Sequence, residues 1–469
     1  MAILGGFSVL QWLALAGYEL LLFAGLFFLI GALDDVLLDL HYLWLKLSGR
    51  ALTPRVNRAK LRNAALSAPI AVLVPAWQED RVIGATVAHM LDAWPQPQLR
   101  LYVGCYRNDP DTAMAVIRAA GGDSRLRLVI HDRMGPSSKA DCLNRLYRAL
   151  RADEARMGWR ARSILLHDAE DMVDAAALPL IDQAMADCDF VQIPVLPEPQ
   201  AGSRWIAGHY SDEFAEAHGK AMVVREALSA ALPAAGVGCA FSHDALDRLA
   251  LRKGRPDSPF ADGSLTEDYE LGLQIAEAGG RSRFLRVRGD DGQLVATRAC
   301  FPNRLADAVR QKTRWVHGIA FQAWDRLGWK GGLSERWMLA RDRRSPLTAL
   351  VLAIAYLLLI LATALWLMDA AGLVRLPPPD PAVKLILTLN LASFVWRAVW
   401  RFAFTTREYG LAEGIFAILR IPVANVISIM AGRRALLAYM RTLKGHEPVW
   451  EKTEHDTHPA FSPARRVAA

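Results

Sequence analysis

Two kinds of hydrophobic pattern divide the chain. Residues 8–33 form an apolar run long enough to cross a bilayer as a helix, and a second such run covers 346–368. A third apolar run, 384–404, follows soon after. Between the first and second runs, short apolar segments alternate with segments of helical period. The pattern predicts a globular domain inserted between an N-terminal transmembrane helix and a C-terminal helical membrane region.

The globular segment has the alternation expected of an α/β domain. Its continuous apolar segments predict strands at 69–75, 99–106, 126–132 and 163–166. The segments between them predict helices at 82–93, 111–120 and 139–151. Strands and helices that alternate in this way form a mostly parallel, doubly wound sheet.

Basic residues set the predicted orientation. Lys and Arg are dense in 46–62 and again in 336–344, on the flanks of the globular segment. By the positive-inside rule these flanks are cytoplasmic, and so is the domain between them. Segment 411–432 is interrupted by Arg420 and Pro422, so it lies in the interface, re-enters or crosses. A basic tail favours three crossings over four.

These features divide the chain into five parts. They are a transmembrane anchor (1–33), a basic interfacial linker (34–67), the globular domain (68–335), a membrane region (336–432) and a basic cytoplasmic tail (433–469).

Composition limits the class of protein to which the chain can belong. Hydrophobic residues make up 53% of the chain, more than a soluble protein of this size usually has. The five cysteines include no CxxC pair, and the histidines have no zinc spacing, so neither a disulfide framework nor a zinc ribbon is expected. We expect the lipid bilayer as a partner and no nucleic acid.

Polar loops follow the predicted strands. The fourth strand runs into HDAED, which crowds Asp168, Glu170 and Asp171 together. Closely spaced carboxylates repel one another unless a cation compensates, and their oxygens suit Mg2+ or Mn2+. An acidic turn or helix N-terminus explains the same letters without a metal.

Three other loops meet this one at the same edge of the sheet. PAWQED (75–80) ends the first strand, YRND (106–109) ends the second, and SSKADCLN (137–144) follows the third. Lys139, just inside a helix start, would suit a phosphate, although the spacing is not that of a P-loop. An ordinary strand-to-helix loop explains PAWQED alone, but four convergent polar loops indicate a ligand site.

Together these loops resemble those of the family 2 glycosyltransferases with a GT-A fold. The resemblance implies that a nucleotide-sugar lies across the strand ends, with a divalent metal, Mg2+ or Mn2+. The implied nucleotide and diphosphate contacts are Pro75, Ala76, Glu79, Asp109, Lys139 and Asn144. The implied metal ligands are Asp168 and Glu170, with Asp171 as a further candidate. The chain departs from the pattern where YRND replaces the usual DDGS and where Glu170 replaces an Asp.

Two later motifs indicate the reaction. LTEDYELG (265–272) resembles the family's TED motif, which consists here of Thr266, Glu267 and Asp268 and implies Asp268 as general base. The same residues also suit a helix N-terminus, and both roles are compatible. QKTRW (311–315) resembles the QxxRW signature of membrane-bound processive synthases. It implies that Gln311 and Arg314 contact the diphosphate and that Trp315 faces a sugar ring.

Within this family, segments such as VGCYRNDPDT, GVGCAFS and the terminal VWEKTEH are closest to the NfrB-type inner-membrane glycosyltransferases, which serve in phage adsorption. The expected function is inverting transfer of a sugar from a UDP-activated donor, an N-acetylhexosamine, to a growing exopolysaccharide. It would take place at the cytoplasmic face of a bacterial inner membrane, with an outer-membrane export partner. The alternatives are addition of one sugar to a lipid-linked (polyprenyl phosphate) acceptor and a non-catalytic envelope scaffold for phage adsorption.

Overall fold

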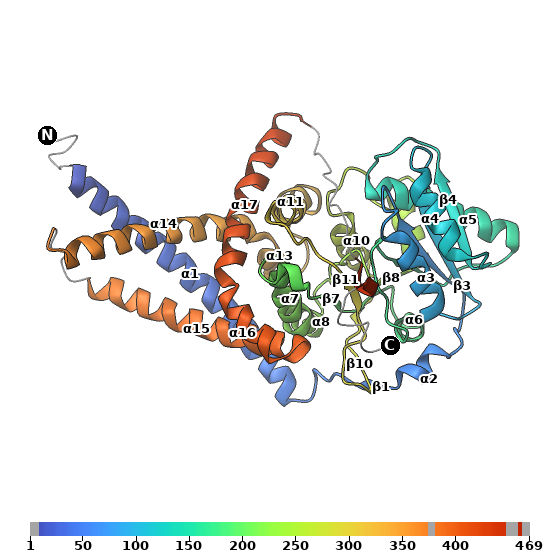
Figure 1. Cartoon of the computed structure of the whole chain (residues 1–469), viewed down its shortest axis with the longest axis horizontal. Helices are drawn as coiled ribbons and strands as arrows, with labels where there is room; N and C mark the ends of the chain where they lie inside the picture. The colour runs from blue at the N-terminus through green and yellow to red at the C-terminus, as the bar shows by residue number, and fades with distance from the viewer. Residues whose placement is uncertain (1–8, 374–379, 447–457, 462–469) are drawn as a thin grey trace.

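The structure is a computed structural model that describes residues 9–373, 380–446 and 458–461. The VWEKTEH motif lies outside these residues. Long helices form one end of the molecule, and an α/β domain forms the other (Figure 1).

A seven-stranded sheet forms the centre of the α/β domain, in the order β4-β3-β2-β5-β8-β6-β9. Its strands are β2 (Ile70–Pro75), β3 (Leu99–Tyr106), β4 (Leu126–His131), β5 (Ser163–Leu166), β6 (Phe190–Gln192), β8 (Cys239–Ser242) and β9 (Ser282–Phe284). β2 runs parallel to β3 and β5, and β3 runs parallel to β4, whereas β8 is antiparallel to its neighbours β5 and β6. The predicted mostly parallel sheet is confirmed.

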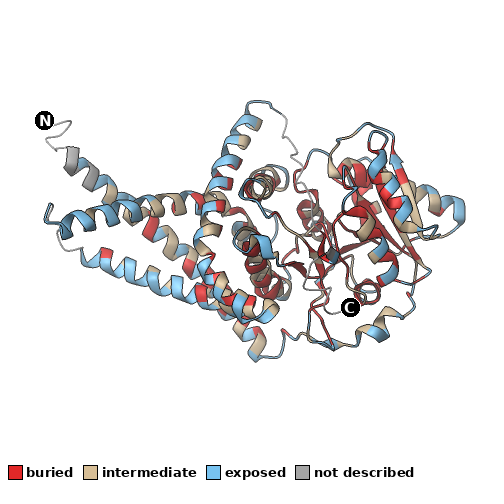
Figure 2. Cartoon of the chain, viewed as in Figure 1, coloured by how far each residue is buried: buried red, intermediate tan, exposed pale blue. Residues whose placement is uncertain are grey.

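Helices cover both faces of this sheet. Side chains alternate along β2, so Ile70, Val72 and Val74 pack on one face while Ala71 and Leu73 pack on the other. The first face is covered by α3 (Ile83–Ala93), α4 (Pro110–Ala120) and α6 (Ala177–Ala184), and the second by α5 (Lys139–Met157), α9 (His243–Arg252) and α10 (Glu267–Glu277). Buried residues are concentrated in this domain (Figure 2). The sheet is therefore doubly wound, as predicted.

The remaining elements connect the sheet to the long helices. Two small parallel pairs join β1 (Arg55–Val56) to β10 (Arg288–Gly289) and β7 (Val195–Pro197) to β11 (Thr297–Ala299). The connecting helices are α2 (Arg58–Arg62), η1 (Ala201–Ser203), α7 (Ile206–Glu216), η2 (Ala217–Ala221), α8 (Met222–Ala227), α11 (Leu305–Val316), η3 (His317–Gln322), α12 (Ala323–Leu327) and α13 (Leu333–Arg343).

Among the described residues, four helices are long and apolar enough to cross a membrane. They are α1 (Val9–Leu47), α14 (Ser345–Ala370), α15 (Pro381–Tyr409) and α17 (Ile421–Leu443). α1 contacts α14 and α15, whereas α17 runs across these helices beside α11 (Figure 1). The short helix α16 (Leu411–Leu419) precedes α17.

Two predicted boundaries do not coincide with helix ends. α1 continues past residue 33 to Leu47, and α17 continues past residue 432 to Leu443. Carboxylates beyond residue 33 are paired: Arg344 contacts Asp34 at 2.5 Å, and Lys220 Nζ lies 2.5 Å from Asp39 Oδ1. A paired carboxylate does not have to leave the helix packing to reach water, so α1 continues as one helix.

Arg420, which interrupts the hydrophobic pattern of 411–432, lies fully buried between α16 and α17. Its Nη2 and Nε donate to Asp212 Oδ1 at 2.6 Å and Oδ2 at 2.9 Å on α7, and its Nη1 donates to Glu413 Oε2 at 2.6 Å. Arg420 therefore attaches the C-terminal helices to the α/β domain.

We predict that Arg420→Leu destabilises the protein by about 3–5 kcal/mol, because it leaves the Asp212 carboxylate buried without its closest cation. The measurement is the thermal midpoint of unfolding of the detergent-solubilised chain, which should be lower in this variant. Arg433→Leu is the control, because Arg433 is exposed on α17. If the two variants unfold at the same temperature, the Arg420 pair does not stabilise the fold.

Candidate active site

One cavity collects the predicted site residues where the parallel strands end. All of them line it except Asp109 and Asn144. The lining residues among them are Pro75, Ala76, Glu79, Lys139, Asp168, Glu170, Asp171, Thr266, Glu267, Asp268, Gln311, Arg314 and Trp315. The four strand-end loops, the TED motif and the QxxRW motif therefore share one cavity.

Lys139 lies among the carboxylates of this cavity. Ser138 caps α5 by accepting a hydrogen bond from the Asp141 backbone N–H, which places Lys139 in the first turn. The Lys139 Nζ lies 2.5 Å from Asp168 Oδ1. Burial lowers the pKa of Lys139, but the charges of Asp168, Glu267 and Asp268 outweigh it and raise the pKa above its ordinary value. Lys139 is thus a fixed cation.

The adjacent carboxylates Glu267 and Asp268 begin α10. Burial and the charge of Asp268 raise the pKa of Glu267 to about 7, although Lys139 opposes the shift. Burial likewise raises the pKa of Asp268, and Lys139 again opposes it. The pair can therefore accept a proton near neutral pH, as a general base must.

Asp171 is held within its own loop. Its Oδ2 accepts hydrogen bonds from His167 Nδ1 at 2.7 Å and from the Asp168 backbone N–H at 3.0 Å. The side chains of Asp171 and His167 are each only 1% exposed. Its Oδ2 therefore holds the loop that carries Asp168, while its Oδ1 is buried without a hydrogen-bond partner among the described residues.

Asp109 and Asn144 do not line the cavity. Asp109 Oδ2 accepts from the Gln78 backbone N–H at 2.6 Å, so it holds the 75–80 turn, where Gln78 has a positive φ. Asn144 Nδ2 donates to Phe260 O at 3.0 Å and to Asp262 Oδ1 at 3.1 Å. Both residues position loops, and neither faces the cavity.

Comparison with known proteins identifies the family. Residues 68–318, more than half of the chain, match the model of the glycosyltransferase like family 2. The chain belongs to this family.

The glycosyltransferase has two close curated relatives. They are the bacteriophage adsorption protein B of Escherichia coli K12 and the bacteriophage N4 adsorption protein B of Escherichia coli O157:H7. Each is 33% identical over 454 residues, which cover 91% of this chain. The chain spans 60% of the length of these relatives.

A solved structure shares the fold. It is a mannosyltransferase from Pyrobaculum calidifontis in complex with GDP-Man and Mn2+, 18% identical, with a TM-score of 0.50. The match covers 85% of this chain and 99% of the mannosyltransferase. The predicted GT-A fold, family and enzyme class are confirmed.

The cavity of the glycosyltransferase offers hard oxygen donors for a divalent metal. Asp168 and Glu170 both line it. Within the described ranges no group of three His, Cys, Asp or Glu side chains could hold an ion by itself. Mg2+ is commonly bound by one or two carboxylates together with substrate phosphates. Asp168 and Glu170 fit this mode, so they would hold Mg2+ or Mn2+.

Several aromatic side chains line the cavity, and sequence reasoning singled out only Trp315 among them. Trp315 lies near the rings of Phe214 and Phe301, at centroid distances of 6.3 and 6.5 Å. Trp77, which also lines the cavity, contacts Tyr106 edge to face at a centroid distance of 5.1 Å. Trp77 is a letter of the PAWQED motif and could have been included, whereas nothing local in the sequence marks Phe214 or Phe301.

The described end of the chain returns to the same loop. His458 is 1% exposed, and the backbone of Asp171 lies beside its ring. Burial lowers the pKa of His458 to about 4, so the ring is neutral at pH 7. Residues 458–461 of the predicted basic tail thus pack on the loop that carries Asp168.

Gly236 touches the predicted base. Its φ is +77°, and a Cβ there would lie 2.3 Å from Asp268 Oδ2. Gly263 has nearly the same φ, +76°, but a Cβ there would meet nothing within 4 Å. The two glycines share the same backbone strain and differ in what a methyl group would displace.

We predict that Gly236→Ala lowers kcat about 100-fold, because displacing a catalytic group by about 1 Å has that effect. Gly263→Ala carries the same strain without this displacement and should retain activity. Initial rates of sugar transfer, with thermal midpoints of both variants, are the measurements. Equal rates in the two variants would show that Asp268 need not occupy its present position.

We also predict that kcat/KM falls as the pH decreases through the pKa of Asp268, which burial raises above its ordinary value, since a base must be deprotonated to act. Glu267→Gln removes the neighbouring negative charge, which lowers the pKa of Asp268. The acid limb of the plot of kcat/KM against pH should therefore move to lower pH. A limb that stays in place would show that Glu267 does not act on the titrating base.

Proposed function

We propose that this glycosyltransferase moves a sugar from a nucleotide-diphosphate donor to an acceptor hydroxyl with inversion, using Asp268 as general base. The carrying observation is that Asp268 shares one cavity with Lys139, Asp168 and Arg314. Removing a proton from the acceptor requires a carboxylate, and the departing diphosphate requires cations.

The proposed roles of the other residues follow from this separation between a proton-accepting carboxylate and cations for the diphosphate. Lys139 and Arg314 would stabilise the diphosphate, with Gln311 beside them. Asp168 and Glu170 would hold Mg2+ or Mn2+, which neutralises charge on the diphosphate when bound. Pro75, Ala76 and Glu79 would contact the nucleotide.

We propose a UDP-activated N-acetylhexosamine as the donor. The resemblance of the loops to the family pattern supports a nucleotide-sugar but does not distinguish the base. The mannosyltransferase with the same fold was solved with GDP-Man, so a donor panel has to include GDP-sugars.

The acceptor we propose is a growing exopolysaccharide at the cytoplasmic face of an inner membrane. Support comes from Trp315, which offers a sugar-stacking face on α11, the helix packed against α17. We propose three crossings, α1, α14 and α15, with α17 along the cytoplasmic interface, because it runs across the other three (Figure 1). An outer-membrane export partner is part of this proposal.

Two other functions remain open to test. Addition of a single sugar to a polyprenyl phosphate is supported by the small number of candidate spans. A non-catalytic scaffold for phage adsorption is supported by Glu170 in place of the usual Asp and by the relatives' names. Product length on a gel distinguishes the polymer from the single addition, and donor binding without turnover would indicate the scaffold.

We predict that Asp268→Asn lowers turnover at least about 100-fold while donor binding is retained, because only the proton acceptor is lost. Glu170→Gln should instead abolish metal-dependent donor binding. Nucleotide release and calorimetric binding, with and without Mn2+, separate the two effects. Asp92→Asn is the control, because the Asp92 side chain is 78% exposed. Undiminished turnover in Asp268→Asn would refute the proposed base.

A further inference from the structure

A second cavity lies among the membrane helices. Its volume is about 780 Å³, and its walls come mainly from α1, α14 and α15, with Ile421 and Asn425 of α17. It shares no lining residue with the catalytic cavity. Helix α7 reaches both cavities, since Phe214 lines the catalytic one and Glu216 lines the second.

One end of this membrane cavity is charged. Its charged lining residues are Asp34, Asp35, Glu216, Arg341, Arg344, Arg397 and Arg401. Four arginines face three carboxylates, so the lining carries one net positive charge. Counting the neighbouring pair of Lys220 and Asp39 leaves the balance unchanged.

The pairing within this cluster is uneven. Arg341 and Arg344 each contact both Asp34 and Asp35. Arg397 pairs with Asp35, and its side chain is 52% exposed. The Nε and Nη2 atoms of Arg401 are buried without a hydrogen-bond partner among the described residues, and its nearest carboxylate oxygen, on Asp212, is 3.8 Å away. Unpaired buried donors of this kind are costly unless a ligand accepts from them.

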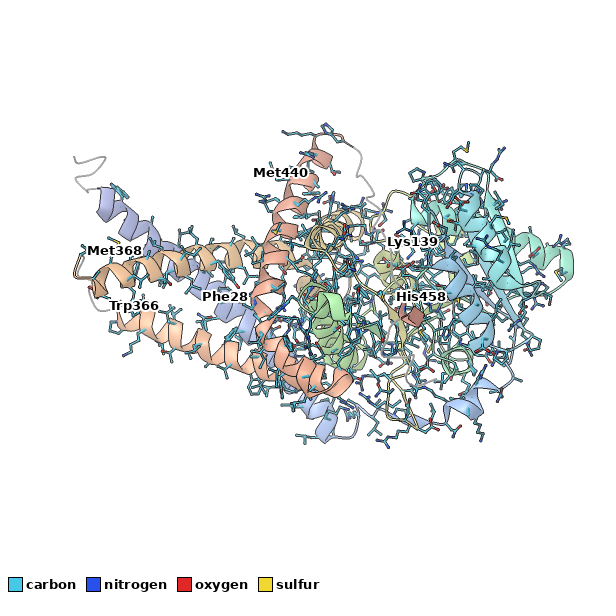
Figure 3. The ribbon with its side chains drawn as sticks, viewed as in Figure 1. Phe28, Lys139, Trp366, Met368, Met440 and His458 are labelled. Atoms are coloured by element: carbon cyan, nitrogen blue, oxygen red, sulfur yellow. The ribbon has the colours of Figure 1, made fainter. Side chains whose placement is uncertain are left out.

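The rest of the cavity is apolar and long. Phe27, Phe28, Val351 and Phe394 are among its lining residues, and Figure 3 shows Phe28 on the part of α1 near α14 and α15. From Arg344 to Leu359 the lining follows α14 for about 22 Å at 1.5 Å per residue. That length exceeds half of a bilayer's hydrocarbon thickness.

Two polar side chains along this apolar part are already hydrogen-bonded. Asn390 Nδ2 donates to Gly25 O at 3.1 Å, and Asn425 Nδ2 donates to the Tyr356 hydroxyl at 3.2 Å. These hydrogen bonds join helices to one another. Few polar side chains therefore remain along this wall to hydrogen-bond the hydroxyls of a glycan. A hydrocarbon chain fits this wall better.

We propose that the membrane cavity binds one anionic phospholipid of the bilayer, with its phosphodiester on Arg397 and Arg401 and an acyl chain between α1, α14 and α15. The single negative charge of a phosphodiester matches the single excess positive charge of the lining. Because the cavity shares no lining residue with the catalytic one, the lipid is a bound ligand of the membrane region and not the sugar acceptor.

Native mass spectrometry of the full chain in detergent tests this site, with phosphatidylglycerol and phosphatidylcholine of identical acyl chains as probes. We expect one phosphatidylglycerol per chain and at least about 10-fold weaker phosphatidylcholine binding, because phosphatidylcholine carries the same phosphodiester but its choline cation cancels the charge and is repelled by the positively charged lining. Arg397→Gln should weaken phosphatidylglycerol binding by a similar factor. Ala355→Phe, which fills the apolar part and keeps every charge, should also weaken it.

Arg407→Gln is the matched control, because Arg407 is on the same helix and does not line the cavity. It should bind phosphatidylglycerol as the unmodified chain does, and circular dichroism should show that all three variants are folded. Equal binding of the two lipids, or binding that survives Ala355→Phe, would overturn the proposal. So would preferential binding of a polyprenyl phosphate that is then glycosylated, or of an oligosaccharide product, in this cavity.

Discussion

The compensation of carboxylates by Lys139 is the constraint on which the catalytic half depends. The fold brings Asp168, Glu267 and Asp268 to one cavity, where burial raises the pKa of Glu267 and that of Asp268. The fixed cation beside Glu267 and Asp268 opposes this rise in their pKa values. The Ser138 cap that begins α5 is therefore part of the site, because it sets where Lys139 lies.

A second set of buried charges attaches the catalytic half to the membrane helices. Arg420 binds Asp212 on α7, and Lys220, just beyond that helix, binds Asp39 on α1. Buried pairs of this kind contribute little net stability but are costly to break. Their effect is to fix one arrangement of α1 and α17 against the α/β domain.

Local sequence predicted most of the sheet and most of the cavity. β2, β3 and β5 coincide almost residue by residue with the predicted strands, because each is a continuous apolar run bounded by polar loops. Contacts between distant segments could not be predicted. The carboxyl-terminal part of α1 is paired with arginines some 300 residues later in the chain. Asp109 and Asn144 hydrogen-bond loops that are distant in sequence, at Gln78 and Phe260 respectively, and nothing in the local sequence indicates these partners. The roles of Gly236 and Phe301 likewise exist only once α10 and α7 are packed beside them.

Helix α7 contacts both the catalytic cavity of the α/β domain and the charged end of the cavity among the membrane helices. Phe214 and Glu216 are two residues apart, so they point to different sides of the helix. One side meets Trp315 and the site of sugar transfer, and the other meets arginines at the base of the membrane helices. Between them, Glu213 pairs with Lys312 of α11, the helix that carries the QxxRW motif. Arg314 and Trp315 follow Lys312 within one turn of α11, so α7 is paired directly with the segment that carries this motif.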